Sequence, residues 1–191
     1  MGHMYSYTLG THTYQFKSLA QLMAKATPQR SGDRLAGVIA QSAQERAVAQ
    51  MTLAEVPLKT FLNDVLIPYE QDEITRLIID EHDANAFKLI SHLTVGDFRN
   101  WLLSDFATPA VLASVRQAIT PEMAAAVSKI MRNQDLILVA KKCHVKSAFR
   151  NTIGLPGHLS TRLQPNHPTD DINGIAACML DGLLYGNGDA V

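Results

Sequence analysis

Residues 159–191, LSTRLQPNHPTDDINGIAACMLDGLLYGNGDAV, decide the fold class of this chain. Polar and apolar side chains alternate over 159–164, which predicts a strand. After an acidic capping run at 169–171, apolar residues recur at helical spacing over 172–183. A second strand is expected to begin at 190–191. Strand, helix and strand in this order predict one unit of a parallel sheet, which needs further strands beside it.

The carboxyl end of the first predicted strand carries the candidate site. Arg162 and Gln164 are two positions apart, so the strand period sends both side chains to the face opposite Leu163. In open sheets and in closed barrels, ligands collect at the carboxyl ends of parallel strands. The pair offers a fixed cation, amide donors and one carbonyl acceptor, which suits a small polar ligand. The alternative interpretation is structural: Arg162 pairs with a carboxylate and Gln164 caps a loop.

The rest of the chain is mainly helical by its pattern. Alternating residues on both sides of Gly10 predict a short amino-terminal hairpin. Ser18 is expected to cap a helix that ends near Lys25, and Thr120 one that ends near Arg132. One long helix is expected from about residue 31 to about residue 55. Further helices are expected near 70–81, 84–92, 96–103, 109–118 and, as a short helix, 137–139.

Composition limits the functional classes. The chain has 191 residues, 47% of them hydrophobic, with 18 acidic and 17 basic side chains and a net charge of −1. This balance gives no basic footprint for nucleic acid or an anionic membrane. No apolar run is long enough to cross a membrane, and no signal peptide opens the chain. Residues 1–3 resemble a cloning scar, and the remainder is expected to be an intracellular globular protein.

Cysteine and histidine supply weaker candidates. Cys143 and His144 lie among lysines and suggest a basic-activated thiolate, but a solvated loop is the favoured interpretation. Cys178 is expected to be a small buried residue on the last helix. His158 and His167 flank the predicted strand but lack a third ligand, so no metal site is expected.

Several short motifs together resemble the large subunit of ethanolamine ammonia-lyase. They are YQFK (14–17), RSGD (30–33), LAGV (35–38), SAQER (42–46), YE (69–70), TRLI (75–78), AKK (140–142), NTIGLPG (151–157), RLQPN (162–166), DD (170–171) and GNGDAV (186–191). They occur in family order and at close to family spacing, so the resemblance covers nearly the whole chain. The segment 81–119 is the least similar.

The resemblance implies a mainly α fold with two domains. Residues 1–150 would form a helical amino-terminal domain that carries the short β-hairpin. Residues 151–191 would begin a (β/α)8 TIM barrel, with its first strand–helix unit and part of its second strand. The family's large subunit is more than twice as long, so the chain is expected to be a truncated, amino-terminal part of it.

The resemblance also implies a reaction, the adenosylcobalamin-dependent radical conversion of ethanolamine to acetaldehyde and ammonia. Arg162 would hydrogen-bond the substrate hydroxyl, and Gln164 would contact the amine end. Carboxylates for the ammonium group and most cobalamin contacts are expected beyond Val191, so the chain alone is expected to bind no cofactor and to be inactive.

The partners implied are the small subunit and further large subunits, with no nucleic acid and no membrane. The location implied is the cytoplasm, including a bacterial microcompartment. The competing hypothesis is a stand-alone α-helical protein-interaction module.

Overall fold

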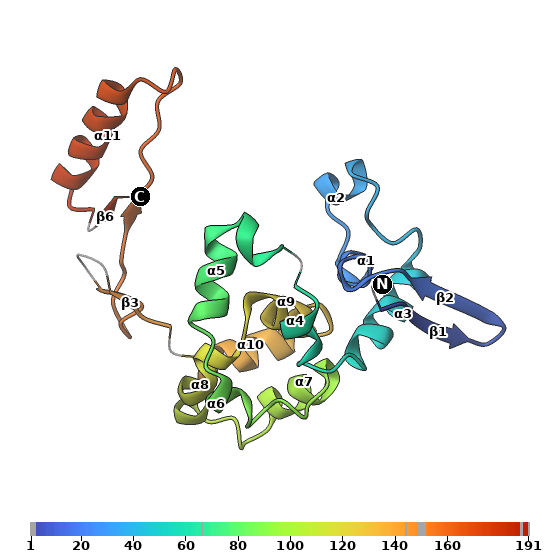
Figure 1. Cartoon of the computed structure of the whole chain (residues 1–191). Coiled ribbons are helices and arrows are strands. Elements are labelled where there is room, and N and C mark those ends of the chain that lie inside the picture. Colours follow the sequence, from blue (N-terminus) through green and yellow to red (C-terminus); the bar gives the residue numbers. More distant parts are fainter. Residues whose placement is uncertain (1–2, 66, 144, 149–151, 188, 191) are drawn as a thin grey trace. The chain divides into compact units, whose positions relative to one another are not determined.

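The computed structural model describes residues 3–65, 67–143, 145–148, 152–187 and 189–190 (Figure 1). The chain divides into two compact units, Met1–Cys143 and His144–Val191. Among the described residues are eleven α-helices and three two-stranded sheets, so the chain is mainly helical, as predicted. None of these helices is long and apolar enough to cross a membrane.

The first unit opens with the predicted hairpin. Strands β1 (Tyr5–Leu9) and β2 (His12–Phe16) pair antiparallel, from Tyr5 opposite Phe16 to Leu9 opposite His12. Gly10 turns the chain at φ +62°, a conformation that is strained for other residues. Tyr5 and Phe16 are buried, so one end of the hairpin is anchored in the core.

Helices make up the rest of the first unit. They are α1 (Leu19–Ala26), α2 (Ser31–Leu35), α3 (Ala43–Ala54), α4 (Thr60–Asn63), α5 (Glu73–Asp80), α6 (Ala84–Phe87), α7 (Val95–Leu103), α8 (Pro109–Val115), α9 (Pro121–Lys129) and α10 (Asn133–Lys142), with 3-10 turns η1 (Tyr69–Gln71) and η2 (Arg116–Ala118). The Ser18 and Thr120 hydroxyls accept backbone hydrogen bonds as the predicted caps of α1 and α9.

The single long helix expected from about residue 31 to about residue 55 is wrong. Helix α2 ends at Leu35, and Gly37 takes φ +69°, which breaks the helical path. Ser42 then starts α3 by accepting a hydrogen bond from the Glu45 backbone N–H at 3.0 Å. The helix expected at 84–92 is also shorter, since α6 ends at Phe87.

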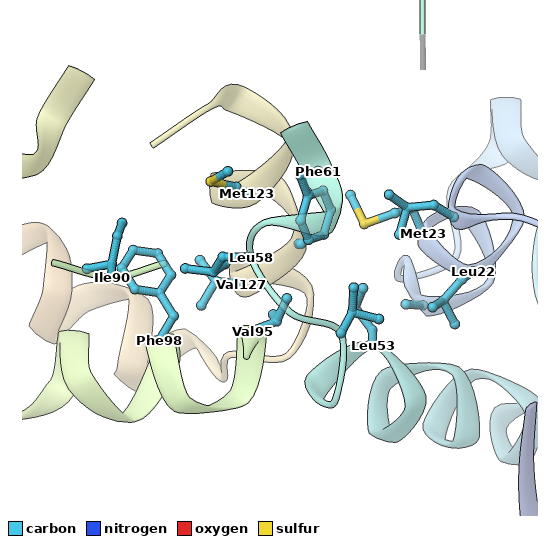
Figure 2. Close-up of a cluster of buried hydrophobic side chains, with 14 of the residues drawn as sticks. Leu22, Met23, Leu53, Leu58, Phe61, Ile90, Val95, Phe98, Met123 and Val127 are labelled. Atoms are coloured by element: carbon cyan, nitrogen blue, oxygen red, sulfur yellow. The ribbon is translucent and has the colours of Figure 1, made fainter. Parts of the chain in front are cut away.

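The core of this unit is continuous from the hairpin and α1 to α7 and α9. Figure 2 shows Leu22 and Met23 at one end, Ile90 and Phe98 at the other, and Leu58 and Val127 between them. A backbone bridge crosses this region: the Leu58 N–H donates to Leu93 O at 3.0 Å and the Val95 N–H to Val56 O at 2.9 Å. It ties the segment after α3 to the start of α7.

The second unit contains the predicted strand–helix–strand element. Strands β3 (Ser147–Ala148) and β4 (Thr152–Ile153) form a small antiparallel pair. Strands β5 (Arg162–Leu163) and β6 (Asp189–Ala190) pair parallel, and α11 (Ile172–Leu184) connects them. Within the described residues this parallel sheet has two strands, too few to close a barrel.

Two expectations for this unit are corrected. The strand expected over 159–164 is reduced to β5, so Leu159 lies outside it and is fully exposed at 102%. Cys178 on α11 is exposed rather than buried. Cys178 is exposed because the two short strands β5 and β6 cover only a small part of α11.

Candidate functional site

The candidate site lies at the carboxyl end of β5. Arg162 and Gln164 are exposed, and Leu163 between them is half-buried, which is the alternation of an extended chain. The backbone register sets Arg162 opposite Asp189 and Leu163 opposite Ala190 in β6. Arg162 therefore lies in one strand of a parallel pair, and Gln164 follows directly after that strand.

Contact with α11 fixes β5. The Leu163 side chain lies against Gly182, where the Cγ atom is 3.0 Å from the position that a Cβ would take. The Gly182 carbonyl also accepts a hydrogen bond from Asn187 Nδ2 at 2.9 Å, which holds the turn that leads from α11 into β6. Gly186 allows this turn at φ +87°. The Leu163 side chain, held against α11, thus sets the direction in which Arg162 and Gln164 point.

The loop between β5 and α11 is shaped by its own polar groups. The Asp171 carboxylate caps α11 by accepting from the Gly174 N–H at 2.7 Å, as the acidic run predicted. Asp170 before it adopts φ +52°, which is uncommon for a residue with a side chain. The His167 ring packs against Gly174, and its Nδ1 is 3.0 Å from the Thr169 hydroxyl. His167 therefore has a structural role in this loop.

The chemistry open to this edge is recognition of a small polar molecule. Among the side chains that the structure describes, none forms an ion pair or a hydrogen bond with Arg162 or Gln164. The guanidinium presents planar, permanently charged donors, and the amide presents donors and an acceptor. Both side chains are exposed, so they form an open edge in the part of the chain that the structure describes.

The other sequence candidates do not join this site. Cys143 is the exposed residue that ends α10, and His158 is also exposed. His144 lies outside the described residues. In the described part of the chain, no three histidine, cysteine, aspartate or glutamate side chains are grouped as a metal ion would need.

Sequence reasoning missed a second feature, a pair of hollows beside α5. One measures about 220 Å³ and lies between α4 and α5, and the other measures about 500 Å³ and lies between α5 and the segment 117–121. Ile78 and His82 line both, and His82 Nε2 is 3.2 Å from the Ala118 carbonyl. The signal in the sequence was the helical spacing of Ile74, Leu77 and Ile78 within the helix expected near 70–81.

Carboxylate groups lie at both ends of α5. Asp72 caps α5, and hydrogen bonds from the Thr75 backbone N–H and hydroxyl hold the pKa of Asp72 below its usual value. At the other end, the Asp80 carboxylate accepts a hydrogen bond from the Tyr69 hydroxyl and raises the pKa of that phenol. The exposed side of α5 is therefore both apolar and negatively charged.

The family model and the relatives that this chain matches carry the same description. A family described as ethanolamine ammonia-lyase large subunit matches residues 14–191. The ethanolamine ammonia-lyase large subunit of Escherichia coli (strain K12) is 44% identical over 184 residues, which cover 96% of this chain and 41% of that protein. The protein of the same description from Salmonella typhimurium matches with the same identity and coverage. The chain thus spans about two fifths of the length of these relatives.

Proposed function

We propose a function from one premise: the chain belongs to the family of ethanolamine ammonia-lyase large subunits. It is the amino-terminal part of such a subunit. Residues 1–150 are its helical domain, and 151–191 begin a (β/α)8 barrel. The observation that supports this most directly is the parallel pairing of β5 with β6 around α11, since this is the repeating element of that barrel.

The complete subunit, in this proposal, converts ethanolamine to acetaldehyde and ammonia. Adenosylcobalamin, when bound, supplies the radical chemistry of this reaction. The residues of this chain bind and orient the substrate at the carboxyl end of β5.

Arg162 binds the hydroxyl end of ethanolamine. Its guanidinium donates hydrogen bonds to the hydroxyl oxygen and stabilises negative charge that develops there during the reaction. The exposed position of Arg162 in β5 supports this role, because the anchored Leu163 beside it restricts how the strand can move.

Gln164 binds the opposite end of the substrate. Its amide oxygen accepts a hydrogen bond from the ammonium group, which has three donors. One neutral acceptor does not balance a full positive charge, so carboxylates from the remainder of the subunit complete the site. Gln164 therefore contributes orientation more than affinity.

The partners proposed for the complete subunit are the small subunit and other large subunits, and its location is the cytoplasm, including a bacterial microcompartment. Residues 14–191 match the family without a break, which supports an intact helical domain for such contacts.

A chimera tests the proposed function. This chain replaces the matching segment of the Escherichia coli large subunit, and the product is assembled with its small subunit and adenosylcobalamin. We expect acetaldehyde release from ethanolamine, and its strong reduction in the same chimera with Arg162→Ala. A chimera that assembles and melts like the Escherichia coli enzyme but releases no acetaldehyde would overturn the proposal.

A further inference from the structure

The chain on either side of Gln164 is held against α11 at two points. Leu163 lies over Gly182, and His167 lies over Gly174, where its Cγ and Nε2 atoms are 2.8 Å from the position that a Cβ would take. The two glycines are eight positions apart in α11, so they lie on one face of the helix. A larger residue at either position would displace the side chain that rests there. Gln164 therefore lies between two contacts with the same helix.

The segment between these contacts has little slack. Positions 174 and 182 of α11 are separated by about 12 Å along the helix axis, because each residue rises by about 1.5 Å. The chain from 163 to 167 advances by four residues, and four residues of fully extended chain span at most about 14 Å. This segment must therefore be nearly extended to reach both glycines, which leaves few other conformations to the backbone at Gln164.

Hydrogen bonds fix the orientation of the His167 ring. The Thr169 backbone N–H donates to Nδ1 at 3.4 Å, and the Thr169 hydroxyl is 3.0 Å from the same atom. Nδ1 accepts the first of these bonds only when it carries no proton, so the ring proton is on Nε2. The His167 carbonyl accepts from the Asp170 N–H at 3.0 Å, which closes the turn that follows the ring. The second contact with α11 is thus made by a half-buried side chain of defined orientation.

We infer that His167 is a positioning residue for Gln164. Its contact with Gly174 keeps the segment extended and so sets where the Gln164 amide meets the substrate, a role that rests on the proposed function of Gln164. Arg162 precedes the contact at Leu163, so its position depends on β5 and not on His167. Loss of the His167 contact should therefore free Gln164 and leave Arg162 in place.

Backbone ¹⁵N relaxation of the 191-residue chain tests the contact without any enzyme activity. The parent should have an order parameter near 0.85 at Gln164, as a rigid backbone does, and His167→Ala should lower it toward about 0.6. Gly174→Ala should act in the same way from the helix side, because the added methyl group displaces the ring although alanine favours a helix. The control is His158→Ala, at an exposed histidine before β5, which should leave Gln164 unchanged. Arg162 should keep its order parameter in every variant.

Steady-state kinetics of the chimera test the positioning role. His167→Ala should lower kcat and raise KM as Gln164→Ala does, with kcat/KM reduced roughly tenfold, since a displacement of about 1 Å can cost up to about 10²-fold. In a Gln164→Ala background the same substitution should have no further effect, because it acts through Gln164. In an Arg162→Ala background it should have its full effect.

Three results would overturn the inference. They are a low order parameter at Gln164 in the parent, an unchanged one in both His167→Ala and Gly174→Ala, and a loss of order at Arg162 as large as that at Gln164, which would mean general unfolding of the second unit. A kinetic loss from His167→Ala that is equal with and without Gln164 would overturn it as well. The expected order parameters together with an inactive parent chimera would support the two contacts and overturn the proposed function alone.

Discussion

The Leu163 side chain of β5 occupies the space above Gly182 of α11 in which any other residue would place its Cβ. Glycine normally weakens a helix interior by about 1 kcal/mol relative to alanine. At this position it allows a strand and a helix to approach each other closely. The contact anchors the strand that carries Arg162 and that Gln164 directly follows.

Gly182→Ala should destabilise the second unit despite the better helix propensity of alanine. The added methyl group displaces Leu163, and overpacking of this kind costs about 1–3 kcal/mol. Hydrogen exchange of the α11 amides measures the effect. Gly32→Ala is the matched control, because a Cβ there meets open space within a helix.

A double variant isolates the cause. In a Leu163→Ala background the methyl group of Gly182→Ala meets no obstacle, so the second substitution should no longer accelerate exchange. If Gly182→Ala accelerates exchange equally in both backgrounds, the loss does not come from the Leu163 contact.

Lys142→Met should destabilise the first unit by about 1.5–3 kcal/mol, since hydrogen bonds to charged groups contribute this much. The Lys142 ammonium donates to Leu102 O at 3.0 Å and to Ser104 O at 2.6 Å, two carbonyls at the end of α7. Urea unfolding measures the free energy. Lys59→Met, at an exposed lysine, should change it by less than about 0.5 kcal/mol, and equal losses in both variants would refute a specific role for Lys142.

Acid should remove a stabilising contribution from Asp135. Hydrogen bonds from the Arg132 side chain, then from the Arg132 backbone N–H, hold the pKa of Asp135 below its ordinary value of 3.8. Because the folded-state pKa is depressed, the contribution is complete above 3.8 and is lost as the pH falls through the lower folded value. Asp135→Asn should therefore lower the melting temperature at neutral pH and approach the parent in acid.

Thermal melts from pH 7 down to acid compare Asp135→Asn with Asp105→Asn, a change at an exposed carboxylate. A gap between parent and Asp135→Asn that stays constant into acid would contradict the assignment.

Arg162→Ala in the complete chimeric enzyme should lower kcat roughly 10²–10³-fold, as loss of one preorganised donor does. Arg162→Lys should recover only part of this loss, because a point charge does not reproduce the planar guanidinium. Gln164→Ala should raise KM as well as lower kcat, since it orients the substrate.

Steady-state acetaldehyde formation gives these values, and Arg116→Ala, at an exposed arginine of the first unit, is the control. Normal turnover by both folded alanine variants would remove Arg162 and Gln164 from the site.

Local rules predicted the elements whose signals are short. The Ser18 and Thr120 caps, the Gly10 turn and the parallel strand–helix–strand order were predicted from a few neighbouring residues each. The break between α2 and α3 was not predicted, because most residues of 31–55 favour a helix and this outweighed the single Gly37. In the structure, the positive φ of Gly37 ends the helical path there.

Burial was harder to predict than periodicity. The apolar spacing of α11 predicted a helix correctly, but it gave no information on how much of that helix has a partner, and Cys178 is exposed. The same limit applies to α5, whose apolar stripe was visible while the hollows beside it depend on residues far away in the sequence, such as Phe61 and Ile119. Period two predicted Arg162 and Gln164 on one face of a strand, and both are exposed on either side of the half-buried Leu163, but β5 ends before Gln164.

The Lys142 contact with the end of α7 has a consequence for synthesis on the ribosome. It ties the last helix of the first unit to a segment already made, and the unit ends at the next residue, Cys143. A helix-rich unit folds in microseconds to milliseconds, whereas translation adds about 5–20 residues per second. The first unit can therefore reach its final structure while β6 has yet to be translated, so newly made β5 lacks its strand partner at a time when the first unit is already folded.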